Sequence, residues 1–181
     1  MILYHDFGLT PEEYQKCDLK KILPVFDVCP HCHAHLQLYR HGFRNRYALV
    51  LGIVFLLVVC RFRCRCCKKS FTLLPSFLLP QFQNTASSII SFLHSGWKIG
   101  KDSIYRQLSY FYRKRFLQNL PLLQGFMIGL GNRDPVPSDK KEKAITILEW
   151  MLSVGCEALV QKFFAQFHQS FMAKMQFDCT T

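Results

Sequence analysis

An apolar run of thirteen residues, ALVLGIVFLLVVC at positions 48–60, dominates the hydrophobic pattern of the chain. As a helix it would rise only about 20 Å, whereas the hydrocarbon core of a bilayer is about 30 Å thick. Arg44 and Arg46 precede it and Arg61 and Arg63 follow it, so no charge asymmetry orients a membrane span. The run predicts the strand pair of a β-hairpin, buried against helices. A membrane or signal-anchor segment is the alternative.

The residues around this run are also β-rich. Residues 27–67 combine β-branched and aromatic residues with short polar breaks, which is typical of short strands. Gly42 and Gly52 are the expected turn or bulge points.

A short helix is expected near the N-terminus, in LTPEEYQKC. Thr10 is a suitable N-cap, Pro11 occupies the first helical position, and Glu13 lies three residues after the cap. Together they predict a capping box.

The second half of the chain shows helical patterns. A helix is expected over residues 85–94 and is closed by Gly96. A longer one, capped by Asp102 or Ser103, ends near Pro121. Two helices joined by a glycine-bearing turn resemble a helix-turn-helix.

The last third contains a loose segment and a final helix. Residues 124–141 carry three glycines and two prolines and predict a linker. Asp139 and Glu142 form a capping box for the final helix, whose neutral charge favours packing or dimerisation. The apolar residues on or near one face of this helix are Ile145, Leu148, Leu152, Leu159, Phe163 and Phe167.

The expected fold class is α+β, a small β-rich ribbon followed by a mostly helical, helix-turn-helix-like region and a C-terminal helix. The expected segments are an N-terminal helix and lead-in (1–28), a ribbon with a long hairpin (29–80, ending in an extended connector marked by Pro75 and Pro80), a helix-turn-helix-like region (81–121), a linker (122–138) and a C-terminal helix (139–177).

Charge is concentrated in two blocks of the chain, whose net charge is +11. Residues 29–69 carry eight Lys or Arg and no acid, and residues 98–115 carry six against Asp102. Solvated surfaces normally mix both signs, so these blocks favour a polyanionic partner, DNA before a membrane.

The cysteine content indicates a reducing compartment. There are nine cysteines, an odd number, and the N-terminus lacks the apolar core of a secretory leader. We therefore expect a cytoplasmic, nucleoid-associated protein and no disulfide framework.

Two CxxC pairs predict a metal site. Cys29 and Cys32 form one, and Cys64 and Cys67 form the other. Each spacing lets a tight turn direct two thiolates at one ion, and two such turns make a tetrahedral Zn²⁺ site. The intervening 31 residues are more than usual, but a hairpin can span them.

The other thiols and the histidines have weaker claims. Cys66 lies between two ligands and is expected to point elsewhere, and Cys60 is expected in the core. A thioredoxin-like redox site is disfavoured, because neither pair stands at a helix N-terminus after a strand. Four histidines could each replace a cysteine ligand but are better explained as surface or strand residues: His31, His33, His35 and His41.

The motif CPHC…HGFRNR…RFRCRCCKKSF resembles the zinc ribbon of bacterial insertion-element transposases and their accessory proteins, and an uncharacterised mobile-element-associated ribbon family. GKDSIYRQL is similar to the start of the recognition helix that follows such ribbons. The resemblance covers residues 1 to about 120 and implies a ligand role for the four CxxC cysteines. It also implies that Phe71 packs beneath the ribbon. Lys68 stands where the family commonly has glycine, which predicts a less regular second turn.

The DNA contacts are expected in two groups. Arg61, Arg63 and Arg65 alternate along a strand and should share one face that tracks phosphates. Arg106 and Gln107 lie in the first turn of the predicted recognition helix, where side chains can read bases. The full expected set is Arg44, Arg46, Arg61, Arg63, Arg65, Lys68, Lys69, Lys101, Ser103, Arg106, Gln107, Tyr110, Arg113 and Lys114. The alternative is a solvated amphipathic helix with Ile104, Leu108 and Phe111 in the core.

Catalysis is not expected. Only twelve acids occur, and none has the strand context of an acidic triad that holds two metal ions. P-loop, GxSxG and HExxH motifs are absent from the sequence. We therefore expect a DNA-binding regulator, or the DNA-recognition partner of a separately encoded recombinase. A zinc ribbon that binds protein and an inactive, truncated transposase are the alternatives.

Overall fold

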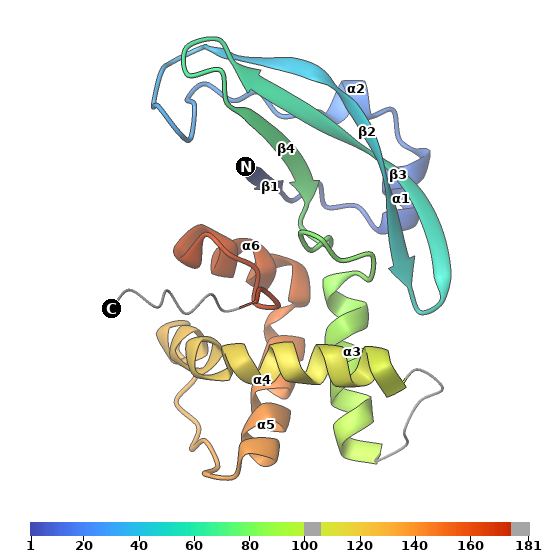
Figure 1. Cartoon of the computed structure of the whole chain (residues 1–181), viewed down its shortest axis with the longest axis vertical. Helices are drawn as coiled ribbons and strands as arrows, with labels where there is room; N and C mark the ends of the chain where they lie inside the picture. The colour runs from blue at the N-terminus through green and yellow to red at the C-terminus, as the bar shows by residue number, and fades with distance from the viewer. Residues whose placement is uncertain (100–105, 175–181) are drawn as a thin grey trace. The chain divides into compact units, whose positions relative to one another are not determined.

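The strands lie in the first half of the chain and the longer helices in the second half, which gives an α+β fold. The computed structural model describes residues 1–99 and 106–174. The chain divides into two compact units, Met1–Thr85 and Ala86–Thr181. All strands of the described chain lie in the first unit, and the second is helical (Figure 1).

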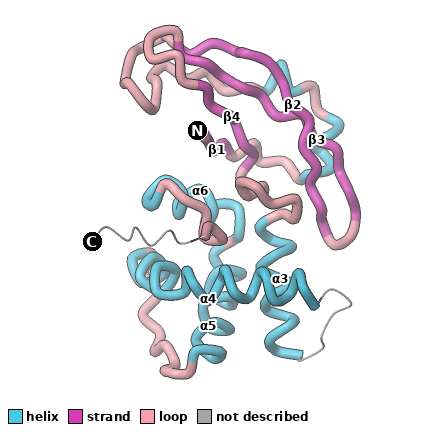
Figure 2. The backbone as a smooth tube through the Cα atoms, in the orientation of Figure 1, coloured by secondary structure: helices cyan, strands magenta, loops and turns pink. Residues whose placement is uncertain are grey.

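The first unit is built on a four-stranded mixed sheet (Figure 2). Its strands, in spatial order, are β1 (Ile2–His5), β4 (Ser70–Pro75), β3 (Ile53–Cys64) and β2 (Leu38–Val50). β1 runs parallel to β4, and the other neighbours are antiparallel. The sequence did not predict β1, and it placed residues 73–75 in a connector, whereas they belong to the buried strand β4.

The predicted hairpin is confirmed as β2 and β3. Its turn is Leu51-Gly52, with φ of 49° and 89°, and a tight hairpin turn of type I′ requires positive φ at both positions. The predicted irregularity at Gly42 is also present. Arg40 pairs with Phe62 and Gly42 with Arg61, which leaves one extra residue in β2, a β-bulge.

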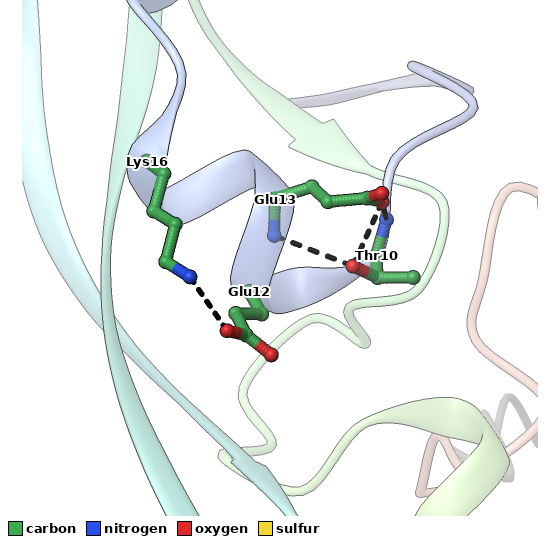
Figure 3. Close-up of polar contacts among 4 residues, drawn as sticks. All are labelled: Thr10, Glu12, Glu13 and Lys16. Atoms are coloured by element: carbon green, nitrogen blue, oxygen red, sulfur yellow. Dashed lines mark hydrogen bonds and ion pairs between the residues drawn. The ribbon is translucent and has the colours of Figure 1, made fainter.

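The predicted N-terminal helix is confirmed as α1 (Pro11–Lys16), with its capping box (Figure 3). The Glu13 N–H donates to Thr10 Oγ1 at 3.3 Å, and the Thr10 N–H donates to Glu13 Oε2 at 2.8 Å. Lys16 pairs with Glu12 one turn earlier, with 2.6 Å between the charged atoms. A second short helix, α2 (Leu19–Ile22), follows and was not predicted.

Helix α1 covers part of the β3 edge that β4 does not reach. β4 pairs with β3 only as far as Arg61. Beyond that point the Tyr14 hydroxyl donates to the Val58 carbonyl at 3.1 Å, and Gln15 Nε2 donates to the Leu56 carbonyl at 3.2 Å. Tyr14 is itself buried in the core of this unit. The N-terminal residues therefore belong to the same body as the hairpin and protect one of its edges.

The apolar run is only partly buried, so the predicted burial of the strand pair is confirmed in part. Leu57 and Val59 are buried, but the alternate residues of β3 toward the turn are exposed. Directly paired residues share a face of the sheet, so the register joins these β3 residues to exposed neighbours on β2. We call this surface the apolar hairpin face; it comprises Phe43, Tyr47, Val54, Leu56 and Val58, which are 41–57% exposed.

The first two helices of the second unit are longer than predicted. Helix α3 (Ala86–Ile99) continues through Gly96, and α4 (Arg106–Gly129) continues through Pro121. A side chain at position 96 would meet the guanidinium of Arg113 at 3.1 Å, so this glycine makes room for α4. Pro121 is exposed, while Leu120 and Leu123 beside it are buried and hold the helix in place.

The predicted linker and final helix also differ from the structure. Because α4 extends to Gly129, the linker is shorter than the expected 122–138. The single C-terminal helix is two helices, α5 (Lys140–Val154) and α6 (Cys156–Phe167). Gly155 separates them, with a φ of 92° that interrupts a helix. Asp139 caps α5 as predicted, with Oδ2 accepting from the N–H groups of Lys141 and Glu142.

No single helix among the described residues is long and apolar enough to cross a bilayer. Helices α5 and α6 have the length and composition of a span only when taken together, and they are bent by 107°.

Replacing Leu51 with Asn should stabilise the hairpin. Leu51 is 82% exposed and holds a left-handed conformation that costs a branched side chain about 1 kcal/mol, whereas Asn adopts it readily. Hydrogen exchange of the β3 amides should slow by roughly fivefold in Leu51→Asn. Leu51→Val is the control and should exchange faster. Slower exchange in Leu51→Val than in Leu51→Asn would contradict the assigned turn.

Candidate metal centre

Four cysteine sulfurs converge at one end of the hairpin. Cys29 Sγ lies 3.8 Å from Cys67 Sγ, and Cys32 Sγ lies 3.7 Å from Cys64 Sγ. All four sulfurs lie within 4.8 Å of one another. A regular tetrahedron with Zn–S bonds of ~2.3 Å has an edge of about 3.8 Å. The donor set and spacing therefore fit one tetrahedral thiophilic ion, as the two CxxC pairs predict.

The two CxxC turns have the same backbone pattern. In each, the N–H of the first cysteine donates to the carbonyl five residues later, and the N–H four residues later donates back to the first cysteine's carbonyl. The four bonds are Cys29 N to Ala34 O (3.0 Å), His33 N to Cys29 O (2.9 Å), Cys64 N to Lys69 O (3.0 Å) and Lys68 N to Cys64 O (3.1 Å). Two segments 35 residues apart thus form matching knuckles for one ion.

The residue after each CxxC pair is in the left-handed region. His33 has a φ of 57° and Lys68 a φ of 60°. Glycine adopts this conformation most easily, which explains why a glycine is expected at position 68. The prediction that Lys68 makes the second turn less regular is wrong, because its hydrogen bonds match those of the first knuckle.

Backbone N–H groups favour thiolate at Cys64. Burial raises the pKa of this thiol, but hydrogen bonds from the Cys67 and Cys66 backbones and from neighbouring thiols outweigh it and lower the pKa to about 7. At Cys67, burial is the largest effect and raises the pKa. The Cys64 thiol is therefore prepared to lose its proton, which metal ligation requires.

Both knuckles are tied to neighbouring backbone. The Arg63 Nε–H donates to the Lys68 carbonyl at 3.2 Å, and the Arg65 N–H donates to the Gln37 carbonyl at 2.9 Å. Val28 and His35 form an antiparallel bridge around the first knuckle. Arg63 therefore positions the second knuckle, in addition to the phosphate contact expected of it.

The remaining cysteines and histidines lie outside the cluster, as expected. Cys60 is fully buried, and burial raises the pKa of its thiol. Cys66 is exposed between two cysteines of the cluster. The four histidines considered as possible ligands are all exposed: His31, His33, His35 and His41. In the part of the chain that the structure describes, the four thiols are the one group of three or more ligand side chains close enough to hold an ion.

Two arginines expected to contact DNA make contacts within the fold. Arg46 is half-buried, which lowers its pKa, and its guanidinium donates to the carbonyls of Leu79 and Phe82. Arg113 donates to the Gly96 carbonyl at 2.8 Å and lies over the Trp97 ring. Both side chains fasten neighbouring segments together, so neither is freely available to a phosphate.

The other expected DNA contacts are mostly exposed. Lys114 lies over the Tyr110 ring, with 5.9 Å between its ammonium nitrogen and the ring centre. Lys101 and Ser103 lie outside the described residues. The exposed members of the set are Arg44, Arg61, Arg65, Lys68, Lys69, Arg106, Gln107, Tyr110 and Lys114.

Arg61 and Arg63 share a face of the sheet, as their alternation predicts. They pair with Thr72 and Ser70 on β4, and Arg63 also pairs with Tyr39 on β2. Arg65 lies beyond the strand end, but its guanidinium reaches over the Tyr39 ring at 5.5 Å. Sequence reasoning missed Tyr39, because only the register across the bulge places it beside the arginines.

Residues 29–109 match the model of a family described as a domain of unknown function, DUF6431. The matched segment contains all four clustered cysteines, the whole hairpin and the start of α4. Comparison with curated proteins and with solved structures gave no significant match.

Zinc content should separate ligand from non-ligand cysteines. We expect about one zinc per chain in the purified protein, loss of zinc in Cys64→Ser, and retention in Cys66→Ser, measured by elemental analysis. The second variant is a matched control, because Cys66 lies in the same turn but is exposed. Equal zinc content in the two variants would contradict the assigned cluster.

Proposed function

We propose that this chain is a zinc-dependent DNA-binding protein of a mobile element, acting as a regulator or as the DNA-recognition partner of a separate recombinase. Zn²⁺ is the resident ion in this proposal, and its role is structural, because four protein thiolates leave no open coordination position for a substrate. The observation that carries the proposal is the convergence of four thiols within a basic stretch of sequence, residues 29–69, that contains no acid.

The charge around the cluster supports a polyanionic partner. Eight Lys or Arg residues and no acid occur between residues 29 and 69. None of the ion pairs found within residues 1–99 and 106–174 involves a Lys or Arg of this block, so no carboxylate pairs with it. A rigid, uncompensated basic surface suits phosphates, which release counterions on binding.

In this proposal, the second unit recognises the base sequence of the DNA. Arg106 and Gln107 are exposed in the first turn of α4. Arginine suits guanine and glutamine suits adenine in the major groove. The helix-turn-helix role of α3 and α4 and the link to a mobile element follow from the resemblance in the sequence. We assign the chain no catalytic activity.

Protein binding is the second candidate function, favoured by the apolar hairpin face. Five large apolar side chains exposed on one side of a hairpin are unusual for a surface that meets only water. A zinc ribbon that binds a polymerase or a transposase would cover such a surface.

Salt dependence should distinguish these functions. If DNA is the partner, log affinity for a duplex should fall linearly with log salt, by about 0.9 per phosphate contacted. Arg61→Gln should flatten this slope by roughly one unit. Arg133→Gln removes the same charge from an exposed position of the second unit and should leave the slope unchanged. A shallow slope for the unmodified protein would favour the protein-binding function.

Base reading should depend on Arg106. After selection of a preferred duplex, Arg106→Ala should cost roughly 1–3 kcal/mol on that site and relax preference at one position. Lys114→Ala, on the same helix, should weaken all sequences alike. These affinities can be measured by fluorescence anisotropy. A uniform loss in Arg106→Ala would contradict a reading role for α4.

A further inference from the structure

One face of the sheet collects cationic, planar and hydroxyl side chains at the metal end. Arg63 lies directly between Tyr39 and Ser70, and Arg61 pairs with Thr72, so these residues share one face by register. Arg44 joins them, because it pairs with Val59, two residues before Arg61. We call this surface the basic sheet face; it comprises Tyr39, His41, Arg44, Arg61, Arg63, Arg65, Ser70 and Thr72.

Three planar side chains form a row on this face. The Arg65 guanidinium lies 5.5 Å from the centre of the Tyr39 ring, and the His41 ring lies 6.1 Å from Tyr39 in an edge arrangement. His41 is the extra residue at the bulge, and its contact with Tyr39 places it on the same side. Guanidinium, phenol and imidazole groups all present π surfaces on which a nucleobase can stack.

The cations of this face are held but not neutralised. Arg63 is fixed through its Nε–H bond to Lys68. Arg44 and Arg61 are exposed. None of these three arginines pairs with a carboxylate in the described part of the chain. They can therefore receive phosphate groups beside the planar row.

A groove continues the face away from the metal. It has a volume of about 440 Å³, and its walls include Arg44, Thr72 and Val59 of the sheet and the exposed Gln81 and Gln83 of the following turn. Glutamine amides carry both donors and acceptors and can pair with the edges of unstacked bases. Phosphate, stacking and base-edge groups thus lie along one path.

We propose that the basic sheet face binds single-stranded nucleic acid, with bases stacked on Tyr39 and His41 and phosphates on Arg44 and Arg61. This inference rests on the proposed nucleic-acid function and names its substrate class. A base within a duplex is already stacked on both sides and has no free face for Tyr39, whereas a single strand offers one. A protein of DNA transactions meets such strands wherever the duplex is opened.

The test compares fluorescence anisotropy of the zinc-loaded full chain with a labelled dT12, a U12 of equal length and a 12-base-pair duplex. We expect tighter binding of the single strands. Tyr39→Ala should weaken that binding by roughly 5- to 150-fold, the range found for loss of one base–aromatic stack. Tyr39→Phe should keep it, because the ring remains. Phe43→Ala removes an aromatic ring from the opposite face of the same strand and is the matched control.

Each outcome decides one point. Zinc content and circular dichroism identify a variant that has not folded, and the preference of the unmodified protein for single strands over the duplex then carries the test. Preference for the duplex, or unchanged single-strand binding in Tyr39→Ala, overturns this inference and leaves the proposed function standing. Failure of the zinc-loaded protein to bind any of the three probes overturns both. Tighter binding of U12 than dT12 supports the inference and contradicts DNA as the partner.

Discussion

The convergence of four thiols is the constraint on which the first unit depends. Cys29 and Cys32 precede β2, and Cys64 and Cys67 lie at the end of β3. One ion would therefore join the two strands at the open end of a long hairpin. An isolated two-stranded hairpin is marginal in water, and here β4 supports only the metal-proximal part of β3. Without the ion, the four buried or half-buried thiols would have no common bonding partner. The two knuckles would then lose the link that holds them together.

Local chemistry explains which parts of the fold could be predicted. The capping box at Thr10, the CxxC knuckles and the turn at Gly52 each depend on residues a few positions apart, and all three are present. β1 could not be predicted in the same way, because its four residues become a strand only by pairing with β4, about 70 residues later. Gly96 was misjudged as a helix end because its small size serves a distant neighbour, Arg113.

The residues of the candidate site also divide into those that nearby sequence predicts and those whose roles depend on distant contacts. The four candidate ligand positions follow from spacing alone, whereas the roles of the arginines depend on tertiary contacts. The sequence predicts that Arg46 and Arg113 are surface charges. In the structure, each side chain donates a hydrogen bond to a backbone carbonyl of another segment. Tyr39 became a candidate only once the bulge at residues 40–42 fixed the register of β2 against β3. The hairpin thereby acquires two unlike faces, one apolar and one basic.

X-ray absorption at the zinc edge tests the central claim most directly, because it reports the donor atoms and their distances in the intact protein. A structural site formed by Cys29, Cys32, Cys64 and Cys67 predicts four sulfur neighbours at about 2.3 Å and no nitrogen shell. Imidazole nitrogen in the shell, or a protein that folds with no bound zinc, would contradict the account.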